Sequence, residues 1–345
     1  MTLAIVIADT VPKAEALAPQ WQQLPASGAS SIYTSPAWCL AAWRNFPDLG
    51  PPRLVAVGSG ETLIGVMPLT AGSDSLSWAG WPLGDEHDAR IPTGHRGDEV
   101  AAALLCGAAS VSHGCATPEL KDVRSGGVLT HAVASRRGCP APILQLRDPD
   151  ADFGPIACVP GWSRDRRRGL RSARRRLAKT GTVAFERITD PDRLARALPP
   201  FVKARLAAWR HRCRLDELPT MDRHINFPDF LADVGRRLGS SGQCYLAVLR
   251  LDGEPIAQSL LFRTPDADLL YMSTYQPEMG RYGPSHLLLS EIASAAVTDG
   301  RRIIELGRGD EPYKFDLGAE QRHLRNLPPQ RISERATQMP VRTLT

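Results

Sequence analysis

The first half of the chain alternates short apolar runs with loops, which is typical of strands that form a sheet. Apolar runs at 3–8, 53–58 and 62–69 predict strands. The three residues 59–61 predict a hairpin between the last two runs. A further strand is expected over 75–81. The helices expected in this half cover 12–23, 37–46 and about 99–110.

The second half has a clearer order of elements. In sequence, we expect a strand at 182–188, helices at 190–211 and 227–238, strands at 244–251, 255–263 and 268–275, a helix at 285–298 and a strand at 302–306. Asp252-Gly253 is a strong turn signal and predicts a hairpin between the first two strands of the triplet. This order predicts an α+β fold in which helices cover a mixed sheet.

Residues 148–163 separate the two halves with a stretch dense in proline, glycine and aspartate, which is typical of a linker. The chain has 345 residues, enough for about two domains of ordinary size. We therefore expect an N-terminal domain over 1–160 and a C-terminal domain over 161–330. The last ~15 residues are expected to form a linker or a frayed end.

Composition excludes several classes of protein. Apolar residues make up 43% of the chain and charged residues 23%, which excludes disorder over most of its length. The longest apolar run, 100–109, is half of the roughly 20 residues that a membrane span needs. No basic segment precedes the apolar start, so no signal peptide is expected. The seven cysteines include no C-x-x-C pair, which favours reduced thiols and a cytoplasmic location.

Positive charge is concentrated in one segment. The chain carries a net charge of +5, whereas 164–179 alone holds eight arginines and one lysine against one aspartate. Leu170, Ala173 and Leu177 follow the i, i+3, i+7 spacing of a helix that docks by one edge. Two interpretations stay open. The segment is either an anion site for nucleotide phosphates, tRNA or a lipid surface, or a solvated helix that bridges the two domains.

A loop with Gly280, Gly283 and Pro284 precedes the helix at 285–298. The start of a helix presents unpaired backbone N–H groups and the positive end of the helix dipole, so this loop is suited to bind a phosphate. Arg281 would add a charge-assisted contact. An ordinary strand-to-helix connection has the same residues, and both interpretations stay open at this point.

Three antiparallel strands followed by a loop, a helix and a strand form the core order of GNAT acyltransferases. The segments RRRGLRSARRRLAKTG (166–181), FVKARLAAWR (201–210), LDGEPIAQSLLF (251–262), YGPSHLLLSEIASAAVTDG (282–300) and IIELGRGDEPYKF (303–315) make the resemblance specific. In them the chain resembles the CelD-like N-acyltransferase domains of polysaccharide-biosynthesis loci, which are relatives of the Fem-type aminoacyl transferases.

The N-terminal half resembles the same proteins through SPAWCLAAW (35–43) and MPL (67–69). The resemblance thus covers about 30–315 and implies two GNAT-like domains in tandem. Each would be a mixed, largely antiparallel sheet flanked by helices, and the N-terminal one would be degenerate. One departure concerns Gly283-Pro284-Ser285, where relatives usually have Ser-Pro-Gly. The GNAT pyrophosphate loop is therefore not intact, and Pro284 lacks an N–H.

The resemblance also implies the chemistry. Acetyl-CoA or another acyl-CoA would be the co-substrate, without a metal. The residues implied to bind it are Arg281, Gly283, Ser285 and His286. The acceptor would be a small-molecule amine, such as an amino sugar or a peptide-like metabolite, bound between the domains.

Catalytic residues are expected in the loop after the last strand. Asp310, or Glu311 beside it, would accept the proton of the amine. Tyr313 would donate to the leaving group. Lys314 would hold a carboxylate or phosphate of the acceptor, or pair with Asp310. The structural alternative is a Lys–Asp pair with a buried tyrosine that closes the loop.

Two other functions stay open. A Fem-type transferase would take its acyl group from aminoacyl-tRNA, with the basic segment 164–179 as an RNA contact. A catalytically inactive binding protein would keep the GNAT fold and use the same segment as a contact surface, because a fold alone does not prove catalysis.

Overall fold

The computed structural model describes residues 3–72, 75–92, 95–112, 119–148, 158–212, 214, 220–329 and 341–344. The chain forms two compact units. Unit 1 comprises Met1–Pro140 together with His323–Thr345, and unit 2 comprises Ala141–Arg322. The boundaries thus differ from the expected 160/161 and 330. Most of the expected linker, residues 149–157, lies outside the described part of the chain.

Strand pairing explains where the boundaries fall. Strand β7 (Ile143–Gln145) pairs with β12 (Ile303–Glu305) and therefore belongs to unit 2. Strand β13 (His323–Leu327) pairs with two strands of unit 1, so the chain returns there after unit 2. A short strand, β14 (Val341–Thr343), pairs with the first strand of the chain. The expectation of a linker or frayed end is wrong at these residues.

Unit 1 is built on a five-stranded sheet of order β14-β1-β2-β3-β4. Its other strands are β1 (Leu3–Ala8), β2 (Pro52–Ser59), β3 (Thr62–Ala71) and β4 (Leu76–Trp78). The helices are α1 (Val11–Gln23), α2 (Ser30–Tyr33), α3 (Pro36–Asn45), α4 (His95–Val111) and α5 (Val128–Ala132). A second, three-stranded sheet has β13 at its centre, between β5 (Leu120–Val123) and β6 (Arg136–Pro140). The predicted hairpin of β2 and β3 is confirmed.

Asp88 closes the start of α5. Its carboxylate accepts backbone N–H groups from Ala89 at 2.9 Å, Val128 at 2.8 Å and Leu129 at 3.1 Å. Burial nevertheless raises the pKa of Asp88 to about 7, since desolvation outweighs these three hydrogen bonds. Between about pH 4 and pH 7, the folded protein therefore holds a proton that the unfolded chain, with an ordinary aspartate pKa of about 3.9, has already released.

Because the folded protein binds this proton more tightly than the unfolded chain does, we expect the free energy of unfolding to depend on pH. The contribution of Asp88 is fully present below about pH 4 and is lost as the pH rises towards 7, by up to about 4 kcal/mol in the free energy of unfolding. Urea unfolding of the full chain from pH 4 to 8 measures it. The difference between wild type and Asp88→Asn should change across this range. A difference that stays constant from pH 4 to 8 contradicts the assignment.

Unit 2 is built on a six-stranded sheet of order β7-β12-β11-β10-β9-β8. Its remaining strands are β8 (Val183–Ile188), β9 (Cys244–Leu251), β10 (Glu254–Arg263) and β11 (Ala267–Tyr275). The α-helices are α6 (Arg164–Ala178), α7 (Pro191–His211), α8 (Phe227–Ser240), α9 (Pro284–Thr298) and α10 (Pro312–Asp316). The described residues of unit 2 also form the 3-10 helices η4 (Thr220–Arg223) and η5 (Pro277–Tyr282).

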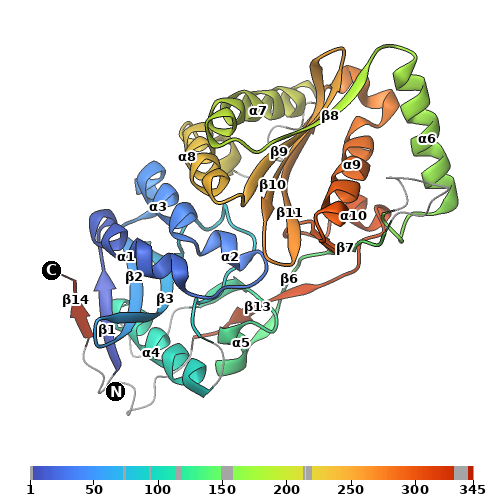
Figure 1. Ribbon diagram of the computed structural model, residues 1–345. Helices are drawn as coiled ribbons and strands as arrows, with labels where there is room; N and C mark the ends of the chain where they lie inside the picture. The colour runs from blue at the N-terminus through green and yellow to red at the C-terminus, as the bar shows by residue number, and fades with distance from the viewer. Residues whose placement is uncertain are drawn as a thin grey trace. The chain divides into compact units, whose positions relative to one another are not determined.

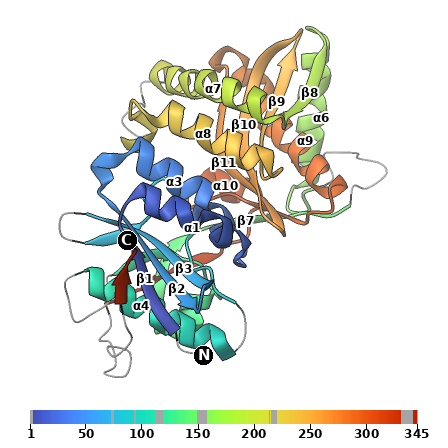
Figure 2. The same cartoon turned by 60° about the vertical axis from the view of Figure 1, so that its left-hand side comes forward.

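Helices cover both faces of this sheet. Helices α7 and α8 lie on one face, and α9 lies on the other with α6 packed beside it (Figures 1 and 2). Helix α9 faces the sheet with buried leucine, isoleucine and alanine side chains, and α6 joins the same core through Leu170, Ala173 and Leu177. The predicted apolar edge of the basic helix is confirmed.

Both units have the same order of elements: a strand, helices, three antiparallel strands, a helix and a further strand. The predicted fold class, antiparallel-rich mixed sheets flanked by helices, is confirmed. Unit 1 departs in its last strand, because β5 joins the separate three-stranded sheet instead of the main one. In unit 2 the last strand, β12, lies next to β11 in the main sheet.

Candidate functional site

Strands β11 and β12 run parallel and then part. They pair only between Ala267–Leu269 and Ile303–Glu305, after which β12 ends and β11 continues to Tyr275. Within the described residues, no strand pairs with this side of β11 beyond Leu269. A strand edge without a partner presents N–H and C=O groups that an extended ligand can bind. The gap is therefore suited to a linear chain.

A β-bulge lies where the two strands part. Leu260 of β10 pairs with Met272, but Leu261 pairs with Leu270, which leaves Tyr271 as the extra residue of β11. A bulge increases the local twist and changes the direction of backbone groups, and bulges are frequent beside active sites. Nearby, Arg205 of α7 donates to the carbonyl of Ser273 at 2.7 Å, which fixes α7 against β11.

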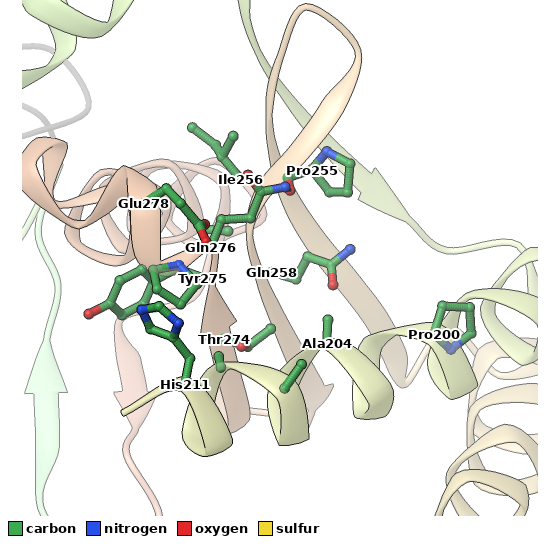
Figure 3. Close-up of a pocket in the computed structure, with 14 residues that line it drawn as sticks. Pro200, Ala204, His211, Pro255, Ile256, Gln258, Thr274, Tyr275, Gln276 and Glu278 are labelled. Carbon is green, nitrogen blue, oxygen red and sulfur yellow. The ribbon is translucent and has the colours of Figure 1, made fainter. Parts of the chain in front are cut away.

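A cavity of about 520 Å³ lies between α7 and the adjoining ends of β10 and β11 (Figure 3). Small apolar residues of α7, among them Pro200, Ala204 and Ala207, form one wall. Gln258 of β10 and Thr274 of β11 line the strand side. Tyr275, Gln276 and Glu278 line the end where β11 passes into η5, and His211 of α7 also lines the cavity. All of these residues belong to unit 2.

The turn from β11 to α9 is tightly closed. Gly283 adopts a left-handed conformation with a φ of 59°. Within the turn, Met279 donates to the carbonyl of Gln276 at 3.0 Å, and Gly283 donates to that of Gly280 at 2.9 Å. His286 and Leu287 both donate to the carbonyl of Gly283, at 3.0 and 3.1 Å. Pro284 has no N–H. The backbone N–H groups of Gly283 and His286 at the start of α9, which could otherwise bind a phosphate, are thus already used inside the turn.

Side chains near this turn are positively charged. Arg281 is exposed, and its guanidinium carbon lies 4.9 Å from the centre of the neighbouring Tyr282 ring. Helix α6 packs against η5 and α9, and its Arg174 forms an ion pair with Glu291 of α9. Desolvation of the His286 ring, and then the charge of Arg166 on α6, lower the pKa of His286. A phosphate bound here would therefore contact cationic side chains more than backbone N–H groups.

The loop after β12 is held by Lys314. This lysine is 2% exposed, donates to the carbonyls of Arg308 at 2.7 Å and Gly307 at 3.4 Å, and pairs with Glu311 at 2.9 Å. The structural alternative is wrong in two details, because the acidic partner is Glu311 rather than Asp310, and Tyr313 is 53% exposed rather than buried. Asp310 is exposed as well.

The structure does not gather all predicted residues around the cavity. Neither 281–286 nor 310–314 contributes to its lining. The residues that do line it were missed in the sequence. Gln258 and Thr274 were detectable in principle, since each is a polar residue within a largely apolar strand.

Comparison with known proteins identifies the fold of unit 2. Residues 164–315, from the start of α6 to α10, match the family model described as an acetyltransferase (GNAT) domain. Unit 2 is a GNAT-fold domain. The GNAT assignment agrees with the order of its elements, three antiparallel strands followed by a loop, a helix and a strand. No curated protein matches the chain in sequence.

Solved structures share the GNAT-like fold over nearly the whole chain. FemX has a TM-score of 0.59 at 12% identity, over 91% of this chain and 95% of FemX. The C-terminal domain of a putative lysylphosphatidylglycerol synthetase from Agrobacterium fabrum gives 0.60 at 12% identity, covering 95% of each chain. L-PGS from Bacillus licheniformis gives 0.60 at 14% identity, over 95% of this chain and 94% of that one. At these identities the likeness concerns the fold alone. No described helix is long and apolar enough to cross a membrane.

Proposed function

We propose that the GNAT-fold domain transfers an acyl group from a phosphate-containing carrier to the nitrogen of an amine. One observation carries this proposal. The last residues of β11 border the gap left by β12 and also line the cavity beside α7. A donor that enters along the gap and an acceptor that enters the cavity would thus meet at one strand.

Acyl transfer requires little chemistry from the protein itself. The amine nitrogen forms a bond with the acyl carbon, and the bond from that carbon to sulfur or oxygen breaks. The amine loses a proton, and the leaving group takes one. The protein aligns the two reactants, stabilises the oxyanion and accepts the proton. Backbone N–H groups on the free side of β11 are the proposed oxyanion donors.

The loop after β12 supplies the proposed acid–base groups. Asp310, with Glu311 as its alternative, is the proposed acceptor of the amine proton, and Tyr313 the proposed donor to the leaving group. Lys314 has a positioning role in this proposal, since its ammonium group is bound to the carbonyls of its own loop. The chain's resemblance to CelD-like domains supports an amino sugar or a peptide-like amine as acceptor.

Two classes of donor are compatible with the fold. Acetyl-CoA or another acyl-CoA is the first, because GNAT-fold domains usually take it. Its pyrophosphate does not fit the backbone of the closed turn and would depend on Arg281, Ser285, His286 and Arg166. That misfit, together with the arginine-rich surface of α6 and the likeness to FemX, favours aminoacyl-tRNA as the second donor.

A cytoplasmic location belongs to the same proposal. It is supported by buried thiols that form no disulfide, those of Cys39, Cys106, Cys158 and Cys244.

Native mass spectrometry of the full chain with coenzyme A, acetyl-CoA and longer acyl-CoAs tests the first donor. We expect one-to-one binding, weakened about tenfold or more by Arg281→Ala, since a charge-assisted contact contributes about 1.5–3 kcal/mol. Arg236→Ala, on the exposed side of α8, is the matched control and should bind as wild type does.

The second donor needs a parallel titration with aminoacyl-tRNA at several salt concentrations. Binding that falls steeply with salt, without any thioester binding, would replace acyl-CoA by tRNA. Absence of both would contradict acyl transfer and leave a GNAT-fold binding protein.

A further inference from the structure

On its strand side, the cavity beside α7 has two polar side chains that form no hydrogen bond with another described residue. Gln258 and Thr274 are direct partners in the register of β10 and β11, so their side chains lie side by side on one face of the sheet. Within the described residues neither side chain has a hydrogen-bond partner. The next polar residues along the two strands are satisfied, since Ser259 and Ser273 bond each other at 2.8 Å and Gln276 donates to Pro255 at 2.8 Å.

Thr274 is buried, and both residues stand on rigid central strands. The two side chains are accessible from the cavity, so a ligand that fills it can replace their water with direct hydrogen bonds. Together the amide and the hydroxyl can donate and accept in one place. This combination matches hydroxyl or amide groups of a ligand.

The charged residues that line the cavity further limit the class of ligand that it can bind. Of the described residues that line the cavity, none is a lysine or an arginine, and Glu278 brings one carboxylate. Glu278 is exposed and forms no ion pair with a described residue. Arg212 lies over the Tyr275 ring at 4.4 Å but does not line the cavity. The arginine-rich helix α6, in contrast, packs against α9 on the opposite side of the sheet from α7 (Figure 1).

We propose that this cavity binds the acceptor as a small amine whose neighbouring groups are hydroxyls or amides and which carries no phosphate or carboxylate. Glu278 attracts the ammonium form, while Gln258 and Thr274 bind the neutral groups. The volume of about 520 Å³ suits such a molecule. The ammonium loses one proton before attack, and its nitrogen loses a second as the amide forms. This inference rests on the proposed acyl transfer and adds the class of acceptor.

Binding without any donor tests the inference separately from acyl transfer. The probes are two matched pairs, D-glucosamine with D-glucosamine 6-phosphate, and L-alaninamide with L-alanine, titrated into the full chain by ligand-observed NMR. We expect a member without an anionic group to bind at least tenfold more tightly than its partner in at least one pair. Equal or tighter binding of the anionic members, or binding of none of the four, overturns the proposal.

Variants locate the binding. Ala204 is exposed on α7 and lines the cavity, so the indole of Ala204→Trp should fill the cavity and abolish binding. Ala102→Trp, on the exposed side of α4, should leave binding unchanged. Glu278→Lys should reduce or reverse the preference within a pair, and Glu254→Lys, exposed at the start of β10, should leave it unchanged. Thr274→Val and Gln258→Leu should each weaken binding about tenfold.

Turnover separates this inference from the proposed function. If the protein acylates an amine and Ala204→Trp keeps full turnover, the acceptor binds elsewhere and the cavity assignment fails, while acyl transfer stands. If the neutral probes bind in the cavity but no donor of either class is used, acyl transfer fails and the binding specificity stands.

Discussion

Replacing Asp268 by alanine should lower the free energy of unfolding by about 3–5 kcal/mol, because it leaves buried polar partners without their shared acceptor. Asp268 is fully buried near the start of β11. It accepts the hydroxyl of Tyr245 at 2.6 Å and pairs with Arg301 at 2.9 Å, with Arg263 at 3.8 Å. Burial raises the pKa of Asp268 despite these partners, which shows how strongly the site is desolvated. Urea unfolding of the full chain measures the effect.

Tyr245→Phe is the matched control for this network. It removes one hydrogen bond but keeps the ring and the ion pairs, so we expect a loss of about 1 kcal/mol. If Asp268→Ala lowered the free energy of unfolding by less than about 1 kcal/mol, the ion pairs of Asp268 would make no net contribution to stability. The location makes the result informative, since Asp268 lies in the three-residue segment that keeps β11 and β12 together before they part.

Replacing Lys314 by methionine should lower turnover about 100-fold, once donor and acceptor are known. The buried ammonium group joins two carbonyls and Glu311 of one loop, and its loss would let Asp310 and Tyr313 shift. A displacement of about 1 Å in a catalytic group is enough for an effect of this size. We expect kcat to fall while the KM for the donor stays unchanged.

Lys203→Met provides the control, since Lys203 is exposed on α7 and outside the cavity lining. Its turnover should equal that of wild type. Thermal unfolding of both variants shows whether the protein is still folded under assay conditions. A folded Lys314→Met variant with full turnover would contradict the role of this loop.

Local patterns predicted the elements of unit 2 well. The helix expected at 190–211 begins at Pro191, the strand expected at 244–251 has those bounds, and the helix expected at 285–298 begins at Pro284. These elements have strong periodicity and clear end signals such as Asp190 before Pro191. The strands β13 and β14 were missed, because their partners lie far away in the sequence and their residues have no marked alternation.

The site was harder to predict than the fold. A Gly-containing loop before a helix predicted a phosphate-binding turn. The sequence pattern does not show that the backbone N–H and C=O groups of Gly283 form hydrogen bonds within the turn itself. The cavity joins α7 with β10 and β11, whose contributing residues are up to about 80 positions apart. Nothing in a local window indicates that alanines of α7 leave space over Gln258. The role of Lys314 depends similarly on carbonyls that only the folded loop brings together.

The path of the chain has a consequence for synthesis. In the described part of the chain, β13 joins β5 and β6 into one sheet, and β13 is made after all of unit 2. As the chain leaves the ribosome, the described strands of unit 2 are synthesised before β13. The three-stranded sheet of unit 1 can form only after residues 323–327 have been made. The N-terminal part thus reaches its final pairing after the segment that follows it in the sequence.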